Sequence, residues 1–163
     1  MAGTDIVIKA EPLTTENFAA FGEVIVHKRE DRLQTIDQVF AADGQGIRPS
    51  LALIWIASPS GSPVTVEKLE RHPHSAQGFL PLQNGRCLVV ACASMPDGSP
   101  DFSTIRGFVS AAGEGVLYGR NVWHKGITPI EDDAQFAMAM MKTDGGADTE
   151  FATLQTVVQV EVS

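Results

Sequence analysis

The feature that most constrains the fold is a succession of short apolar segments, divided by glycine- and proline-containing turns, from Leu51 onward. Within it, residues 64–71 alternate in hydrophobicity with the period of two that is typical of a β-strand. The segments that we expect to be strands are 51–57, 64–71, 76–82, 86–94, 104–110, 115–118 and 135–142, the first of them buried. Many short strands at regular spacing predict a mainly β fold, either a barrel or a sandwich.

The flanking segments add a few elements to this pattern. Residues 5–10 alternate like a strand, Thr14 and Thr15 can cap a short helix over residues 16–21, and residues 23–27 resemble another strand. Residues 28–50 are rich in charge, glycine and proline and predict a long loop. Residues 149–160 fit a helix or a strand equally well. At 163 residues, the chain 1–163 fits one domain with a few short helices.

Charge and composition exclude several classes of function. Lysine and arginine total 12 against 20 aspartate and glutamate, a formal net charge of −8, whereas nucleic-acid binding relies on clustered cations. No apolar run approaches the ~20 residues of a membrane helix, and the N-terminus lacks the features of a signal peptide. Cys87 and Cys92 lie five residues apart in one apolar run, so we expect them on opposite faces of a strand. A disulfide scaffold is therefore excluded, and we expect a cytoplasmic protein.

Part of the chain follows the second metal-binding motif of cupin barrels, in which glycine, five residues, Pro-x-Gly, two residues and histidine come in order. Here Gly113, Gly119, Asn121 and His124 occupy these positions, so glycine and asparagine replace the proline and the second glycine. Thr128 stands where the motif ends on asparagine. The spacing indicates His124 as a candidate metal ligand in a cupin-like barrel, also described as a double-stranded β-helix or jelly roll.

The first cupin motif is present in altered form. Aligned on Gly85, Glu70-x-His72 stands in for the usual His-x-His pair, Gln77 replaces the glutamate, and His74 is an additional histidine. Residues i and i+2 of a strand share one face, so two such side chains can bind one ion. The four candidate ligands, with the histidine of the second motif, are Glu70, His72, Gln77 and His124. They suit a borderline divalent cation such as nickel, manganese or zinc; a degenerate pocket that has lost its metal fits the sequence as well.

Four segments together resemble the ureidoglycolate lyase family, formerly called ureidoglycolate hydrolase. They are residues 13–25 (LTTENFAAFGEVI), 67–81 (EKLERHPHSAQGFLP), 100–108 (PDFSTIRGF) and 115–124 (GVLYGRNVWH). The resemblance spans roughly residues 11–151 in the same order, and its most specific parts are the Glu-Arg-His-Pro and Val-Trp-His blocks.

The resemblance implies a homodimeric cupin-like enzyme, an amidine-class carbon–nitrogen lyase. It implies cleavage of (S)-ureidoglycolate to glyoxylate and urea late in allantoin degradation, and the family is associated with a nickel requirement. Two positions depart from the family pattern. Lys125-Gly126 follow Val-Trp-His where the family commonly has His-Pro, and Gly119 stands where it often has histidine. The departures keep open a cupin-type enzyme for another small carboxylate, or a non-catalytic binding domain for one.

Elimination of urea from ureidoglycolate requires a base for the hydroxyl proton, an acid for the departing nitrogen and a cation for the carboxylate. His124 is the candidate for the base or a metal ligand, and His72 for a ligand or the acid. Gln77 is a candidate hydrogen-bonding group at the reacting atoms, and Tyr118 either donates a hydrogen bond to the substrate or lines the barrel.

The rest of the predicted substrate site consists of cations and aromatic residues. Lys68 and Arg120 are candidates for binding the carboxylate, although an exposed Lys68 and a structural Arg120 fit the sequence equally well. Trp123 and Phe79 are candidate walls of the pocket, although aromatic residues of a barrel often belong to its core.

Overall fold

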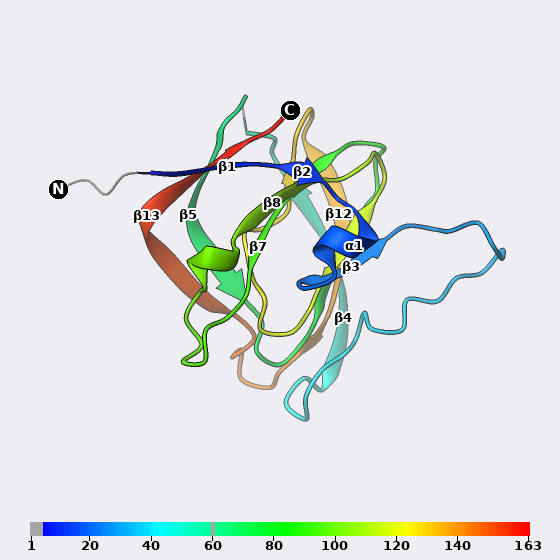
Figure 1. Cartoon of the computed structure of the whole chain (residues 1–163). Helices are drawn as coiled ribbons and strands as arrows, with labels where there is room; N and C mark the ends of the chain where they lie inside the picture. The colour runs from blue at the N-terminus through cyan, green and yellow to red at the C-terminus, as the bar shows by residue number, and fades with distance from the viewer. Residues whose placement is uncertain (1–4, 60) are drawn as a thin grey trace.

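The structure is a computed structural model and describes residues 5–59 and 61–163. The chain forms two β-sheets that curve around a common interior (Figure 1). The larger sheet has the order β1 (Ile6–Lys9), β13 (Glu150–Glu161), β5 (Val64–Arg71), β10 (Trp123–His124), β7 (Cys87–Cys92), β8 (Arg106–Val109), β2 (Glu11–Pro12), and β11 (Thr128–Pro129) pairs with β7. The smaller sheet has the order β3 (Gly22–Ile25), β9 (Gly115–Tyr118), β6 (Gln77–Pro81), β12 (Ala134–Lys142), β4 (Arg48–Ile56). This arrangement confirms the expected cupin-like β-barrel.

Helical structure is short, as the sequence predicts. α1 (Thr15–Phe18) begins at the N-cap Thr14, whose side chain accepts a hydrogen bond from the backbone of Asn17 and completes a capping box. The 3₁₀ helix η1 (Phe102–Thr104) lies between β7 and β8. No helix in the described part of the chain is long and apolar enough to cross a membrane.

The larger sheet buries apolar side chains on both of its faces. Cys87, Val89 and Ala91 of β7 belong to the cluster inside the barrel, with Phe79 and Phe136 from the opposite sheet. The intervening residues of β7 belong to a second cluster, which β1, β5 and β13 cover. The prediction that the two cysteines point to opposite faces is therefore confirmed, and both are free thiols.

β5 breaks its own alternation, and this break positions the candidate site. Val66 and Leu69 lie three residues apart but share the second cluster, and the register with β13 shifts at the same place. Beyond the break, Glu70 lies opposite His124, which lies opposite Ala91 of the barrel interior. Lys68, two residues before Glu70, therefore also faces inward. The change of register therefore places Lys68 on the face of β5 that carries Glu70 and not on the face that carries Val66.

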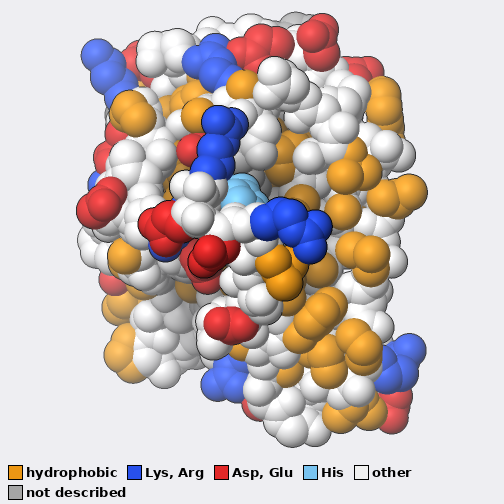
Figure 2. Space-filling model, turned by 90° about the vertical axis from the view of Figure 1, so that its right-hand side faces the viewer, with side chains coloured by type: hydrophobic (Ala, Val, Ile, Leu, Met, Phe, Trp, Pro, Cys, Tyr) orange, Lys and Arg blue, Asp and Glu red, His pale blue; other side chains and the backbone are white. Residues whose placement is uncertain are grey.

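The prediction of a buried strand at residues 51–57 is wrong in its burial, because one face of β4 is exposed. The strand is the edge of the smaller sheet and pairs with β12. Only its inner face is covered, and Leu51, Leu53 and Trp55 on the outer face are 74%, 69% and 63% exposed. Hydrophobic side chains gather over this side of the molecule (Figure 2). The apolar composition of the strand therefore reflects one core face and one uncovered face.

Two further segments complete the fold: the long loop that the sequence predicts over residues 28–50, and the ambiguous residues 149–160. The long loop between β3 and β4 places Ile36, Val39 and Ala41 against the outer face of the smaller sheet, where they pack with Leu117. Residues 149–160, which fitted either a helix or a strand, lie almost entirely in β13, which pairs with β1 in parallel and β5 in antiparallel orientation.

Candidate active site

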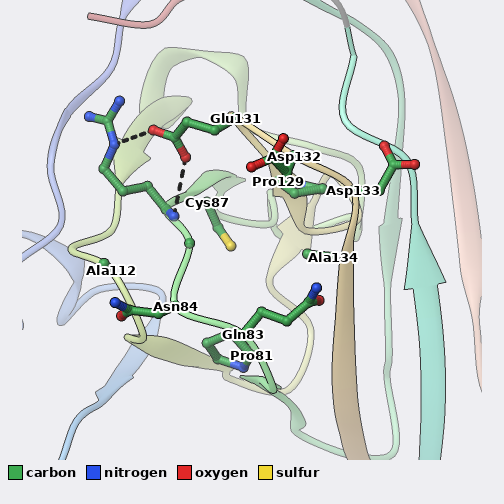
Figure 3. Close-up of a pocket in the computed structure, with 12 residues that line it drawn as sticks. Pro81, Gln83, Asn84, Cys87, Ala112, Pro129, Glu131, Asp132, Asp133 and Ala134 are labelled. Atoms are coloured by element: carbon green, nitrogen blue, oxygen red, sulfur yellow. Dashed lines mark hydrogen bonds and ion pairs between the residues drawn. The ribbon is translucent and has the colours of Figure 1, made fainter.

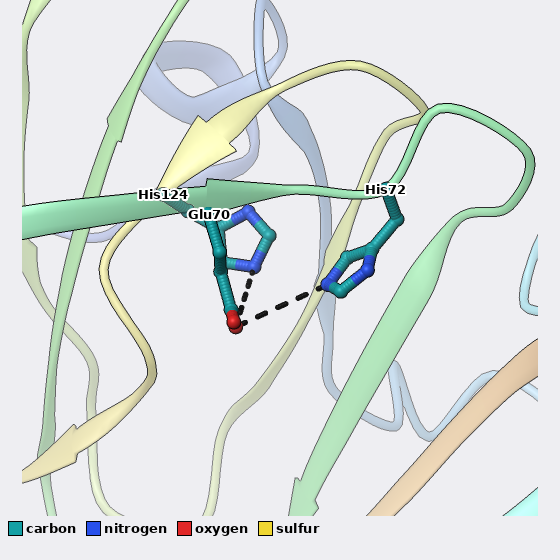
Figure 4. Close-up of side chains that lie close together, drawn as sticks. All are labelled: Glu70, His72 and His124. Carbon is teal, nitrogen blue, oxygen red and sulfur yellow. Dashed lines mark ion pairs between the residues drawn. The ribbon is translucent and has the colours of Figure 1, made fainter. Parts of the chain in front are cut away.

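Glu70, His72 and His124 meet at the inner face of the barrel (Figure 4). Glu70 of β5 and His124 of β10 are direct cross-strand neighbours, and His72 follows β5 by one residue. Glu70 Oε1 lies 3.4 Å from His124 Nε2 and 3.9 Å from His72 Nε2. The three potential ligand atoms lie within 4.8 Å of one another. Three candidate ligands that come from the two separate cupin motifs are therefore neighbours in space.

Backbone carbonyl groups orient both imidazole rings. His72 Nδ1 lies 3.0 Å from the carbonyl oxygen of Asp148, and His124 Nδ1 lies 3.0 Å from that of Val122. A carbonyl oxygen only accepts, so each Nδ1 carries the proton that it donates. Each Nε2 is thereby directed at Glu70, the arrangement by which metal-binding histidines are commonly held.

The electrostatics of the group favour a charged Glu70 beside a neutral His72. Burial disfavours the charge of Glu70, but the hydrogen bond and charge of His124, with the charges of His72 and Lys68, lower its pKa overall. Burial, followed by the charge of His124, lowers the pKa of His72. The pair therefore combines an ionised carboxylate with an imidazole that resists protonation.

These residues fit a divalent cation. His72 is 4% exposed, and its Nε2 has no hydrogen-bond partner within the described residues. A buried polar atom without a partner is costly, and a cation at the centre of the group would satisfy it. Gln77 Oε1 lies 3.0 Å from His124 Nε2 and supplies a further oxygen on the same side. Two imidazoles, a carboxylate and an amide form a donor set for a borderline divalent metal.

Tyr118 supports the group through its ring. It stacks on His124 with the ring centroids 4.0 Å apart and an interplanar angle of 9°. Its hydroxyl is buried and has no partner in the described part of the chain, and burial raises its pKa. Tyr118 thus lines the barrel and orients an imidazole, so its position fits the barrel-lining alternative better than a hydrogen bond to the substrate.

A pocket of about 330 Å³ adjoins the group and includes Glu70 and His124 in its wall. Lys68 also lines it, with Nζ 3.8 Å from the centroid of the Phe151 ring. Lys125 is the second cation of the wall and is half-buried, and this burial lowers its pKa. The pocket therefore places two lysines beside the carboxylate and imidazoles.

Three candidate substrate-binding residues lie elsewhere. Arg120 is exposed, pairs with Asp43 at 3.6 Å and lines a different cavity. Trp123 belongs to the second core cluster, on the face of the larger sheet opposite His124, and donates its indole hydrogen bond to Gly98. Phe79 is 3% exposed in the barrel core. The core alternative noted for the aromatic residues describes their positions better, and we leave all three out of the proposed substrate site.

A second cavity, of about 390 Å³, has a different chemistry (Figure 3). Asp132, Asp133 and Glu131 line it beside Arg86, whose Nε lies 2.6 Å from Glu131 Oε1. None of the three clustered residues Glu70, His72 and His124 lines it. The smaller pocket is therefore the better candidate for the active site.

Comparison with known sequences identifies the family of the chain. The sequence model of the ureidoglycolate lyase family matches residues 5–161. The chain belongs to the ureidoglycolate lyase family. A putative ureidoglycolate lyase of Agrobacterium fabrum is 37% identical over 156 residues, 96% of each chain. The ureidoglycolate lyase of Chelativorans sp. is 32% identical over 88% of this chain and 90% of the relative, and that of Salmonella paratyphi B is 38% identical over 69% and 74%.

The sequence did not identify every residue of the site. Lys125 was noted only as a departure from the family pattern, although its position directly after His124 was an available signal. Two further contributions come from a segment about 80 residues after β5, in which no motif is visible. They are the ring of Phe151, which lies under Lys68, and the carbonyl of Asp148, which orients His72. Only the fold brings that segment to the site.

Proposed function

We propose that this protein cleaves (S)-ureidoglycolate to glyoxylate and urea, a late step of allantoin degradation. The observation that carries the proposal is the unpartnered, buried Nε2 of His72, which faces Glu70 and His124 beside a pocket with two lysines. Family membership supports the choice of substrate.

In this proposal Glu70, His72 and His124 hold a divalent cation, with Gln77 as a further oxygen donor. When bound, the cation would act as a Lewis acid that polarises the substrate hydroxyl and lowers its pKa. The histidines thus take the ligand role among the alternatives that the sequence left open, because their Nδ1 protons are held by backbone carbonyls. Nickel is the metal that family resemblance suggests.

Proton transfer falls to Glu70. Its Oε1 faces the two imidazoles, so we assign Oε2 to accept the hydroxyl proton as the carbonyl of glyoxylate forms. The carbon–nitrogen bond then breaks with its electron pair on the urea nitrogen, and the same carboxyl group returns the proton there. Lys68 lies in the same pocket and provides positive charge for the substrate carboxylate.

Urea release tests the proposal. Purified protein is stripped of metal and assayed with ureidoglycolate before and after addition of nickel or manganese. We expect urea only after metal addition and strong loss in His124→Ala, whereas His27→Ala, an exposed histidine on a loop, behaves as wild type. Activity in stripped protein would instead assign acid–base roles to the imidazoles, and absence of urea in all conditions would contradict the proposed substrate.

We further propose that two copies pair through the outer face of β4. Leu51, Leu53 and Trp55 together expose roughly 400 Å² of side chain, within the size range of the largest apolar patch of a monomer, which is often functional. A stable interface buries about 800 Å² on each partner, so this face supplies about half of it. An edge strand also presents free backbone groups that an antiparallel copy can satisfy about a two-fold axis.

The cytoplasm is the location we propose. Cys87 and Cys92 are free and buried, and burial raises their pKa values to about 11 and about 12. Thiols of this kind are typical of proteins that work in a reducing compartment.

A further inference from the structure

Lys125 is a cation of the site that the reaction outlined above does not use. It follows His124 directly and lines the pocket of about 330 Å³ that contains Glu70 and His124. It also lines an adjoining cavity of about 610 Å³, which shares Thr65 and Gly126 with the first. Its side chain therefore stands where the candidate active site opens into further space.

The charge of Lys125 has no counter-ion within the described residues. None of the carboxylates in this part of the chain lies within 4.0 Å of its Nζ. By contrast, most arginines are already paired with an acidic side chain: Arg48, Arg71, Arg86, Arg106 and Arg120. A half-buried cation in a pocket is stabilised by an anion that enters it. The missing partner therefore points to an anionic ligand.

Hydrogen bonds hold both the backbone and the side-chain nitrogen of Lys125, and this favours the binding of an anionic ligand. Its backbone N–H donates to the carbonyl oxygen of Val90 at 3.0 Å. Its Nζ donates to Thr128 Oγ1 at 3.0 Å, and Thr128 Oγ1 in turn donates to the carbonyl oxygen of Gly126 at 3.0 Å. Much of the conformational freedom of the long side chain is thus already lost before a ligand binds.

We propose that Lys125 binds the carboxylate of the substrate and makes the site selective for a carbinolamide that carries one. The inference rests on the proposed function for the identity of the substrate. Lys68, the other lysine of the pocket, is exposed and lies over the Phe151 ring, so solvent screens its charge more strongly. Lys125 is therefore the principal anchor.

The test compares two substrates that release the same product. Ureidoglycolate carries the carboxylate and hydroxymethylurea lacks it, while both release urea. Because a charge-assisted hydrogen bond is lost, Lys125→Met is expected to lower kcat/KM for ureidoglycolate about 10- to 100-fold, mainly through KM. The same variant should change kcat/KM for hydroxymethylurea less than about threefold, and Lys125→Arg should restore most of the loss. Lys9→Met, the same change at an exposed site on β1, is the matched control.

An equal loss on both substrates would overturn the assignment, as would no loss on either. Thr128→Val keeps the shape of the side chain but removes the oxygen that holds Nζ, and should give a weaker version of the same selective effect. If no variant and no wild-type protein releases urea, the proposed function fails, and an NMR titration with glycolate and its uncharged amide decides the inference separately. Glycolate binding that Lys125→Met abolishes supports the anchor, whereas binding unchanged by the substitution contradicts it.

Discussion

Replacement of Tyr118 by phenylalanine is expected to stabilise the protein and leave catalysis almost unchanged. The side chain is 0% exposed, and its hydroxyl has no hydrogen-bond partner in residues 5–59 and 61–163. In the unfolded chain, water satisfies that hydroxyl, so folding includes a desolvation penalty of about 1–3 kcal/mol. Tyr118→Phe removes the penalty and keeps the ring that stacks on His124.

The lost contacts of the oxygen atom offset part of this gain, which leaves about 1 kcal/mol of net stabilisation. For a chain of this size, that corresponds to a rise in Tm of roughly 2–4 °C. Circular dichroism gives the Tm, and urea release gives the activity. Tyr118→Leu is the comparison, since it removes the stacked ring and should lower both. A Tm that falls in Tyr118→Phe, or a rate lower by about tenfold or more, would refute the reasoning and restore Tyr118 as a hydrogen-bonding group.

Three further predictions concern the ligands, the pH dependence and the assembly. His72→Ala should abolish nickel binding measured by calorimetry, whereas His74→Ala should not, because His74 pairs with Asp43 outside the metal group. The pKa of His72 lies below its ordinary value of 6.5, so the unfolded chain binds a proton that the folded chain resists. The free energy of unfolding should therefore be highest above about pH 6.5 and decline as the pH falls toward the folded-state pKa. Urea denaturation between pH 7 and 5 measures it, and a free energy that stays constant over this range, both in the wild type and in His72→Ala, would count against the prediction. Leu53→Glu should convert a dimer to a monomer in light scattering, and a dimer that survives would move the interface away from β4.

Much of the barrel was predictable because its signals are local. The apolar segments and the turns between them are set by neighbouring residues, and β5 and β9 carry the expected bounds. β10 has two residues and leaves no periodicity to detect. The exposure of Leu53 was also hidden, because a strand at a sheet edge and one inside it can have the same composition.

The candidate site was predictable to the extent that motifs encode it. The spacing of Glu70, His72 and His124 indicated three side chains that the structure brings together. The break in β5 that turns Lys68 inward depends on the register with β13, which is a long-range property. The positions of Arg120 and Trp123 also depend on which face of the fold each loop or strand presents, and spacing alone does not determine this.

The pairing of β13 makes the site dependent on synthesis of the chain as far as this strand. β13 supplies a partner to both β1 and β5, and the carbonyl of Asp148, just before it, fixes the tautomer of His72. On the ribosome, β5 and all three ligand residues emerge before this segment does. A nascent chain that ends before residue 148 would therefore carry every ligand, yet would expose one edge of β5 and leave the His72 ring free to rotate. The active site is assembled only when β13 docks.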